Sequence, residues 1–323
     1  MTTDYLGIDV SKVKLDVTLL QEKQAFSAIF KNNQTGFSAL KKWLEKYQSK
    51  PHAALEATGS YGKAVTRFLY ENGFPLSVVN PMQIKAFSRS EMLRVKTDKV
   101  DSALIARFCR THQPRLWEPL AEVVEELQGL SRRLLELKGM KVQEANRQQA
   151  PGCVGLIRDS VERSLVHLEQ EIAKLEKLIQ AHLDQNPKLK AEKDLLKSIP
   201  GIGDITAALL LSEIGGWERY TSARQLAAHA GLTPMIRQSG SSVRGRGAIS
   251  RLGNANLRKA LFFPAMVAQK CNPIIRDFCE RLAQAGKPKM VVIAAAMRKM
   301  LHIVFGVLKG KEGFKPDYLT SPS

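Results

Sequence analysis

The sequence is poor in the residues that build disulfide frameworks and zinc sites. It contains four cysteines and six histidines, and none of them forms a CxxC pair or falls in zinc-finger spacing. This scatter argues against a small disulfide-stapled domain and against a zinc finger. We expect Cys109, Cys153, Cys271 and Cys279 to be ordinary core or surface thiols.

Long hydrophobic runs and an N-terminal targeting pattern are also missing. No uncharged apolar stretch approaches the roughly 18 residues that would suggest a transmembrane helix. The first residues, MTTDYLGIDV, have an acid where a signal peptide would have lysines. The sequence therefore predicts a cytoplasmic protein that does not use a membrane.

Negative charge is scarce in a chain that is otherwise typical of a folded protein. Lysine and arginine outnumber aspartate and glutamate by 49 to 31, and 44% of the 323 residues are hydrophobic, enough for two or three domains. Between Glu218 and Asp277 there are ten lysines and arginines and no acid. So long a basic stretch favours an anionic partner, most commonly nucleic acid, over a solvated or membrane-facing surface.

Residues 1–118 alternate between strand-like and helix-like patterns. Three strand-like runs follow closely, and helices and strands then take turns up to a strong helix over 98–110. The order β-β-β-α-β-α-β-α predicts an α/β RNase H-like domain. The expected strands are 5–10, 15–20, 25–30, 52–57 and 75–80.

Residues 119–195 form a second region, in which apolar residues recur in heptads on two helices. The Ala150-Pro151-Gly152 break between the helices predicts a coiled-coil hairpin. Flanking Glu and Lys favour an exposed coiled coil that mediates oligomerisation, and a two-helix linker packed on its own domain is the alternative. The heptad positions are Val123, Leu127, Leu130, Leu134 and Leu137, then Val161, Leu165, Leu168, Ile172, Leu175 and Ile179.

Four acids stand where an RNase H-like fold would gather them. Asp9 ends the first strand and Glu56 the fourth, and these strands are neighbours in that fold. Asp98 and Asp101 share one face of a helix start. Carboxylates this close repel one another, and Mg²⁺ or Mn²⁺ would remove the repulsion. Each acid taken alone is also typical of a cap or a turn.

Arg94, Lys96 and Lys99 flank Asp98, and they would either contact the phosphates of a cleaved strand or simply neutralise the acids.

The mostly helical region 196–323 contains a Gly/Ser/Arg-rich segment, QSGSSVRGRG, over 238–247. Glycine allows close backbone approach to a phosphate, and arginine adds charge-assisted hydrogen bonds. Its residues Ser239, Gly240, Ser241, Arg244 and Arg246 favour, on composition alone, a phosphate-binding loop without covalent chemistry. The alternative is a nucleophilic serine, which would need a base or a metal for activation because no histidine lies in the segment.

Two further features of this region fit phosphate binding. Gly201 and Gly203, in SIPGIG before a helix, resemble the turn of helix-hairpin-helix DNA binders, although a simple helix connector gives the same pattern. Arg251 and Arg258 would extend a phosphate track downstream.

Taken together, GIDVSK, EATGSYG, KTDKVDSALIA and AGLTP…QSGSSVRG resemble the DEDD transposases of bacterial insertion sequences. That family includes bridge-RNA-guided recombinases and pilin-gene invertases. The resemblance extends from Gly7 to about Leu308. It implies that Asp9, Glu56, Asp98 and Asp101 are the metal-binding catalytic acids and that Ser239 is the catalytic serine.

The resemblance also implies the partners. A structured noncoding bridge RNA would pair with target and donor DNA, and the coiled coil would assemble dimers and tetramers. The acids and Ser239 would then meet within one subunit or across two. A junction-resolving nuclease that uses the acids without a serine, and a non-enzymatic nucleic-acid scaffold, are the competing hypotheses.

Overall fold

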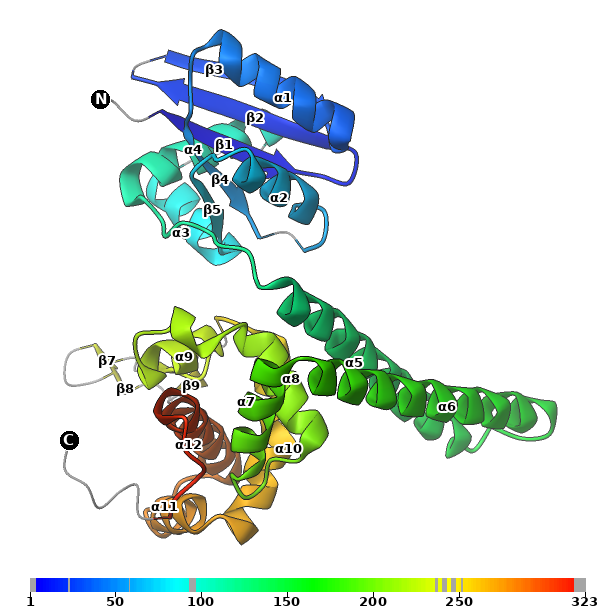
Figure 1. Cartoon of the computed structure of the whole chain (residues 1–323). Helices are drawn as coiled ribbons and strands as arrows, with labels where there is room; N and C mark the ends of the chain where they lie inside the picture. The colour runs from blue at the N-terminus through cyan, green and yellow to red at the C-terminus, as the bar shows by residue number, and fades with distance from the viewer. Residues whose placement is uncertain are drawn as a thin grey trace. The chain divides into compact units, whose positions relative to one another are not determined.

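The structure, a computed structural model, describes residues 4–22, 24–57, 59–92, 97–235, 238–239, 243–244, 248–250 and 252–316. The chain divides into two compact units, residues 1–119 and residues 120–323 (Figure 1). The separate middle domain over 119–195 stays a prediction.

The N-terminal unit is built on a five-stranded sheet in the order β3-β2-β1-β4-β5. Strand β1 pairs antiparallel with β2 and parallel with β4, while β2–β3 is antiparallel and β4–β5 is parallel. This order, with only β2 reversed, is the RNase H-like arrangement, so the predicted fold class is confirmed. The strands are β1 (Tyr5–Val10), β2 (Lys14–Gln21), β3 (Gln24–Lys31), β4 (His52–Glu56) and β5 (Leu76–Val79).

Helices cover both faces of this sheet. Because side chains alternate along a strand, Leu6 and Ile8 face one side, where they pack with Leu40 and Leu69 of helices α1 (Gln34–Lys46) and α2 (Lys63–Glu71). On the other side, Tyr5 packs with residues of α3 (Pro81–Ser90) and α4 (Asp98–His112).

Helix α4 lies unusually close to the sheet at Gly7. A Cβ at this position would overlap the Ser102 carbonyl oxygen and the Ala106 amide nitrogen, so only glycine allows the contact. A buried hydrogen bond of 2.8 Å between the Thr18 and Ser102 hydroxyls ties the helix to β2. These contacts fix the start of α4 relative to β1 and β2.

The second unit begins with a helical hairpin, α5 (Glu122–Gln148) and α6 (Leu156–Gln185), as the heptads predict. Ion pairs of 2.8 Å, Lys138–Glu176 and Lys141–Glu169, join its two helices. Leu127 on the first heptad seam is fully buried in the core of this unit. The hairpin is therefore anchored on its own unit, as in the linker alternative, and its role in oligomerisation stays a prediction.

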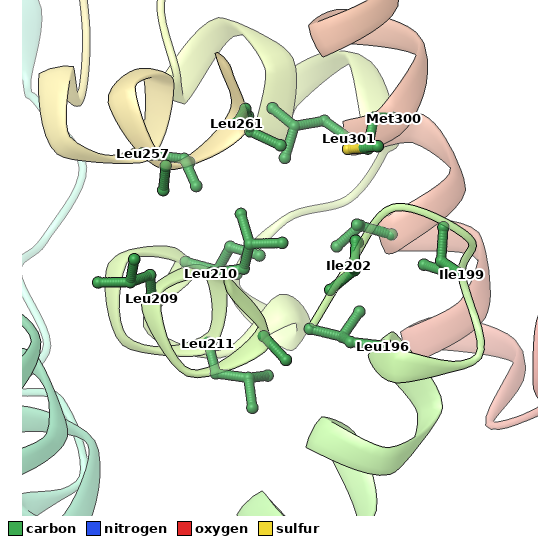
Figure 2. Packing of buried hydrophobic residues seen from close by; sticks show 14 of the residues in the cluster. Leu196, Ile199, Ile202, Leu209, Leu210, Leu211, Leu257, Leu261, Met300 and Leu301 are labelled. Carbon is green, nitrogen blue, oxygen red and sulfur yellow. The ribbon is translucent and has the colours of Figure 1, made fainter. Parts of the chain in front are cut away.

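The rest of the unit is a helical core around α8, in which Leu210, Leu257 and Leu301 are fully buried (Figure 2). Among the described residues, α12 is the one helix long and apolar enough to span a membrane, but half of its apolar window is buried. It is thus a core helix. The helices are α7 (Pro187–Lys197), α8 (Asp204–Ile214), η1 (Trp217–Arg219), α9 (Ala223–His229), α10 (Ala255–Cys271), α11 (Pro273–Gln284) and α12 (Lys289–Gly310).

The cysteines behave as ordinary thiols. Cys109, Cys153 and Cys279 are buried, Cys271 is exposed, and all four are free. Burial raises the pKa of the Cys109 thiol to about 12, so this side chain stays protonated and unreactive.

Candidate active site

The strand acids lie on the sheet face that α4 covers. Asp9 lies on the same face of β1 as Tyr5 and Gly7, and it pairs directly with Asp16 of β2. Ile8 pairs with Leu55 of β4, and Glu56 is the next residue of that strand. Side-chain alternation therefore places Asp9, Asp16 and Glu56 on one face at adjacent strands.

The helix acids enter from the first turn of α4. Thr97 caps the helix, its hydroxyl accepting a hydrogen bond of 3.3 Å from the Val100 amide. Asp98 and Asp101 lie in that turn, where the helix dipole favours negative charge.

The electrostatics of Asp9 show that these acids are close together. Burial and, in decreasing order, the charges of Asp101, Asp98, Asp16 and Glu56 together raise its pKa to about 6. An oxygen-only donor set of this kind suits Mg²⁺ or Mn²⁺. Within the described ranges, however, no three acidic, histidine or cysteine side chains converge tightly enough to enclose an ion.

A lysine lies among these acids. The Lys14 ammonium nitrogen is 3.0 Å from an Asp16 carboxylate oxygen and 2.7 Å from one of Asp98. Hydrogen bonds to Asp98 and then Asp16 raise the pKa of Lys14. The sequence analysis missed both Lys14 and Asp16. The polar–apolar alternation of KLDVT, after a short turn that follows Val10, predicts that Lys14 and Asp16 share a sheet face with Asp9.

The predicted basic residues near these acids are only partly described. Lys99 lies exposed on α4, while Arg94 and Lys96 fall outside the described residues.

The second candidate centre lies in the C-terminal unit, on short paired strands that the sequence analysis treated as a loop. Ser239 of β7 (Gln238–Ser239) pairs antiparallel with Val243 of β8 (Val243–Arg244), and Gln238 pairs with Arg244. Outside them in sequence, β6 (Pro234–Met235) pairs with β9 (Ala248–Ile249). Gly240, Ser241, Arg246 and Arg251 lie outside the described residues.

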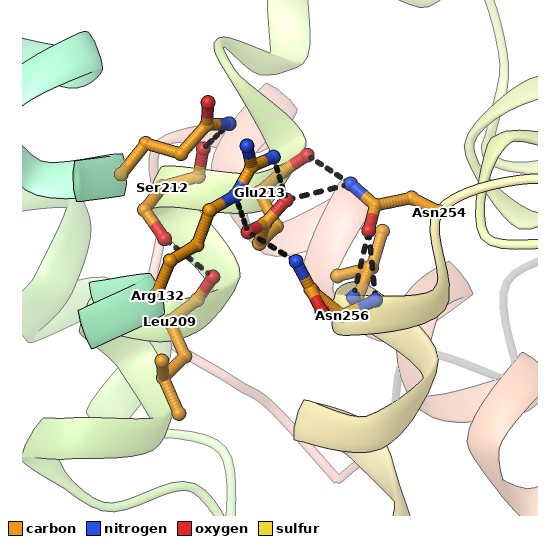
Figure 3. Close-up of polar contacts among 8 residues, drawn as sticks. Arg132, Leu209, Ser212, Glu213, Asn254 and Asn256 are labelled. Carbon is orange, nitrogen blue, oxygen red and sulfur yellow. Dashed lines mark hydrogen bonds and ion pairs between the residues drawn. The ribbon is translucent and has the colours of Figure 1, made fainter. Parts of the chain in front are cut away.

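A buried polar network holds the chain that follows these strands (Figure 3). The Glu213 carboxylate of α8, whose side chain is 1% exposed, accepts hydrogen bonds of 2.8 and 3.1 Å from Arg132 of α5. It also accepts bonds from Asn254 at 2.7 Å and Asn256 at 3.3 Å. Burial alone would raise the pKa of Glu213, but these donors hold it below its ordinary value.

Asn254 extends this network to the segment after β9. Its side-chain oxygen caps α10 by accepting bonds of 3.0 Å from the backbone amides of Asn256 and Leu257, and its backbone N–H donates to the His229 carbonyl at 2.7 Å. The predicted phosphate ligand Arg258 donates a hydrogen bond of 2.8 Å to the Ala230 carbonyl, so part of its guanidinium is used in holding the chain near this network.

The predicted phosphate turn at Gly201 and Gly203 is shaped by packing. Gly201, at φ +102°, lies against Pro264 and Ala268 of α10, where a Cβ would be tight. Space beside Gly203 is open. The Asp204 carboxylate, in the first turn of α8, pairs with Lys197 at 2.8 Å.

An RNase H-like unit with clustered carboxylates, joined to a basic helical unit, is typical of enzymes that cut and transfer DNA strands. Comparison with known families agrees: a DEDD-type family of the IS110 kind, described as "Transposase", matches residues 6–150. The "Transposase IS116/IS110/IS902 family" matches residues 193–280.

Individual relatives support the same assignment. The "Pilin gene-inverting protein" of Moraxella bovis is 33% identical over 97% of this chain and 98% of its own length, and that of Moraxella lacunata gives the same figures. An IS110 protein of Streptomyces coelicolor is 30% identical over 49% of this chain and 38% of its own.

Among solved structures, T. thermophilus RuvC, in complex with a Holliday junction substrate, matches 36% of this chain and 100% of its own. Its identity is 16% and its TM-score is 0.27, too low to support a conclusion.

The chain belongs to the IS110-type DEDD transposase family, which includes the pilin gene-inverting proteins. It is a DNA recombinase of the transposase or invertase type, and the predicted family is confirmed.

Proposed function

We propose that this recombinase cuts and rejoins DNA through a carboxylate site and a serine nucleophile. Asp9, Glu56, Asp98 and Asp101 would hold Mg²⁺ or Mn²⁺, and Ser239 would attack the scissile phosphate. The observation that carries the metal site is the strand register, which places Asp9 and Glu56 on adjacent strands and Asp9 opposite Asp16, and these carboxylates together with burial raise the pKa of Asp9 to about 6. So many acids at one place favour a cationic ligand.

A divalent ion bound there would polarise the phosphodiester and stabilise the charge that develops on its oxygens. The ligands would come from the central sheet and from one helix. Asp9 and Glu56 come from neighbouring parallel strands, and Asp98 and Asp101 come from a helix that Gly7 allows to lie against the sheet.

Ser239 would form a covalent intermediate. Its hydroxyl oxygen bonds to phosphorus, one phosphate ester bond of the strand breaks, and the released strand oxygen takes up a proton as the serine loses one. The phosphoserine ester conserves the energy of the cleaved linkage for rejoining. Gly240, Ser241, Arg244 and Arg246 would contact the phosphate, and Arg94, Lys96, Lys99, Gly201, Gly203, Arg251 and Arg258 would extend the nucleic-acid surface.

The partners follow from the family and the charge. A net charge of +18 suits a protein that binds target DNA, donor DNA and a structured bridge RNA in the bacterial cytoplasm. Sequence choice would then lie in RNA–DNA base pairing. The α5/α6 hairpin would join protomers into dimers and tetramers, since Val142, Leu156 and Ile157 on it are exposed.

A strand-cleavage assay tests this proposal. Labelled DNA carrying candidate sites is incubated with the full chain, Mg²⁺ and the element's RNA, and protein–DNA adducts are separated under denaturing conditions. We expect an adduct that Ser239→Ala abolishes together with strand exchange. If Ser239→Ala cuts as well as the wild type and no adduct forms, the protein is a nuclease that hydrolyses with water.

A mixed oligomer tests whether the acids and the serine come from different subunits. Asp9→Ala and Ser239→Ala chains are each inactive in our proposal, and a site shared between subunits would regain activity when the two are co-assembled. Activity no higher than in either variant alone would contradict the shared site and favour one built within a single chain.

A further inference from the structure

Lys14 connects two acids that differ in their surroundings. Asp16 is buried, with a side chain only 8% exposed, whereas the Asp98 side chain is 55% exposed. The lysine bridges them with one ammonium group, at 3.0 Å and 2.7 Å. Asp98 is an assigned metal ligand in the proposed function, and Asp16 is not.

We propose that Lys14 is a positioning residue that acts as a tethered counter-ion: it holds Asp98 while the site is free of metal and gives it up to a divalent cation. This inference rests on the proposed function, because it takes Asp98 to be a metal ligand. It adds two residues, Lys14 and Asp16, to the machinery that the family's four acids define.

The first argument is charge. Asp9, Asp16, Glu56, Asp98 and Asp101 are close enough for four of them to raise the pKa of the fifth. Without a counter-ion, repulsion among these carboxylates would favour separation of α4 from the sheet. The ammonium of Lys14 is placed at the contact between β2 and α4, where it offsets that repulsion.

The second argument is that the lysine is well anchored. Lys14 begins β2, and its backbone amide donates to the Ser11 hydroxyl at 3.1 Å while its carbonyl accepts from that hydroxyl at 2.9 Å. Asn32 donates to the Ser11 carbonyl at 2.8 Å and fixes the same turn. Because the backbone of Lys14 is fixed, its flexible side chain can reach only acids close to this turn, such as Asp16 and Asp98.

The third argument is the asymmetry between the two partners. A buried carboxylate such as Asp16 is strongly destabilised without a partner, so the ammonium stays with it. Asp98 is mostly solvated and loses little when it leaves the lysine. Asp98 would therefore turn to a bound divalent ion, while Lys14 would stay paired with Asp16.

The test is a Mn²⁺ titration of the full-length protein, in which free Mn²⁺ is measured by electron paramagnetic resonance. Lys14→Met removes the competing charge, and we expect it to bind Mn²⁺ about tenfold more tightly than the wild type. Lys14→Arg keeps the charge and stays near the wild-type affinity. Lys12→Met is the matched control, because Lys12 is exposed in the same turn, and it changes the affinity less than about threefold.

Thermal unfolding gives a second readout. Without metal, Lys14→Met unfolds at a lower temperature than the wild type, and saturating Mg²⁺ raises its midpoint by more than it raises that of the wild type. If Lys14→Met is poorly folded, Lys14→Gln replaces it. Unchanged or weaker Mn²⁺ binding in these variants would overturn the tethered counter-ion. Equal Mn²⁺ binding by wild type and Asp9→Ala would instead reject the proposed metal site itself.

Discussion

The two candidate centres are held in place by different kinds of interaction. The acids of the N-terminal unit stand on paired strands and on a capped helix, and apolar clusters pack on both sides of the sheet, with Ile105 on the side of the acids and Leu6 and Ile8 on the other. Ser239 stands on a two-residue strand pair, and the chain that follows it is held by the buried carboxylate of Glu213. Backbone register positions the first centre, and polar contacts between distant segments position the second.

This difference predicts how each centre fails. A substitution among the acids should remove chemistry and leave the fold intact, because the core beneath them is independent of their charge. A substitution in the Glu213 network should weaken the C-terminal unit first. Variants of the acids, of Gly7 and of Glu213 test that contrast.

The largest effect is expected at the acids. Asp9→Asn removes a proposed metal ligand at nearly constant volume, and we expect a loss of several kcal/mol of transition-state stabilisation to lower strand cleavage roughly a thousandfold or more. The metal-free variant should be no less stable than the wild type, since repulsion around Asp9 is relieved. The cleavage rate is measured with Mg²⁺, and the free energy of unfolding is measured by urea denaturation with a chelator present. A variant that loses activity only because it unfolds would remove the contrast.

A smaller effect on chemistry, with a large one on stability, is expected at Gly7. The Cβ of Gly7→Ala overlaps backbone atoms of Ser102 and Ala106, so α4 must move from the sheet at a cost on the order of 3 kcal/mol. Because Asp98 and Asp101 move with it, cleavage should fall about a hundredfold in the protein that stays folded.

Gly129→Ala is the matched control for this steric argument. Gly129 lies on α5 with no atom near its missing Cβ, so alanine should raise stability by about 0.5–1 kcal/mol. Urea denaturation of both variants gives the comparison, and equal stability of the Gly7 and Gly129 variants would show that α4 is not held by this close contact.

The sequence predicts the first centre far better than the second, for a physical reason. Strand alternation, the DxxD helix start and the β-β-β-α-β-α-β-α order all follow from local periodicity, and they place Asp9 and Glu56 on adjacent strands. Asp16 and Lys14 follow the same alternation, but an acid and a base in an amphipathic strand are typical of a solvent-facing surface. Only the strand register, which pairs Asp16 with Asp9, shows that they belong to the site.

The second centre depends on contacts between distant segments, which the periodicity of the sequence does not predict. Arg132, Glu213 and Asn254 lie 81 and 41 residues apart along the chain, and their types are common on exposed surfaces. The heptads predict the α5/α6 hairpin, yet they do not reveal that Leu127 packs into the C-terminal core. The glycines near Ser239 suggest a loop, whereas the described residues there are paired strands.

Glu213→Gln tests the polar network. Removing the charge leaves the donors of Arg132 and Asn254 poorly matched, and we expect the free energy of unfolding to fall by about 2–3 kcal/mol. Glu136→Gln is the control, because Glu136 pairs with Arg133 in solvent at 3.2 Å and should cost under about 0.5 kcal/mol. If both glutamine variants lose the same free energy of unfolding, the Glu213 network stabilises the C-terminal unit no more than an exposed ion pair does.

A pH dependence is also expected, and its sign follows from Asp9. The folded-state pKa of this carboxyl is about 6 against an ordinary 3.8, so the folded protein holds a proton that the unfolded chain has released. The contribution of Asp9 to stability is therefore complete below 3.8 and is lost as the pH rises through 6. A metal ion needs the deprotonated carboxylate, so its binding has the opposite trend.

Binding of Mn²⁺ should weaken about tenfold for each pH unit below 6 and level off above it. With chelator, the free energy of unfolding should fall between pH 3.8 and 6, and saturating Mg²⁺ should reverse that fall. Asp9→Asn is the control, since it has no proton to exchange and should lose most of both trends. Because these trends arise in the sheet, Glu213→Gln should lower stability at every pH and leave their midpoint unchanged. A midpoint that moves with Glu213 would mean that the two centres, separate in how they are built, are coupled in how they bind charge.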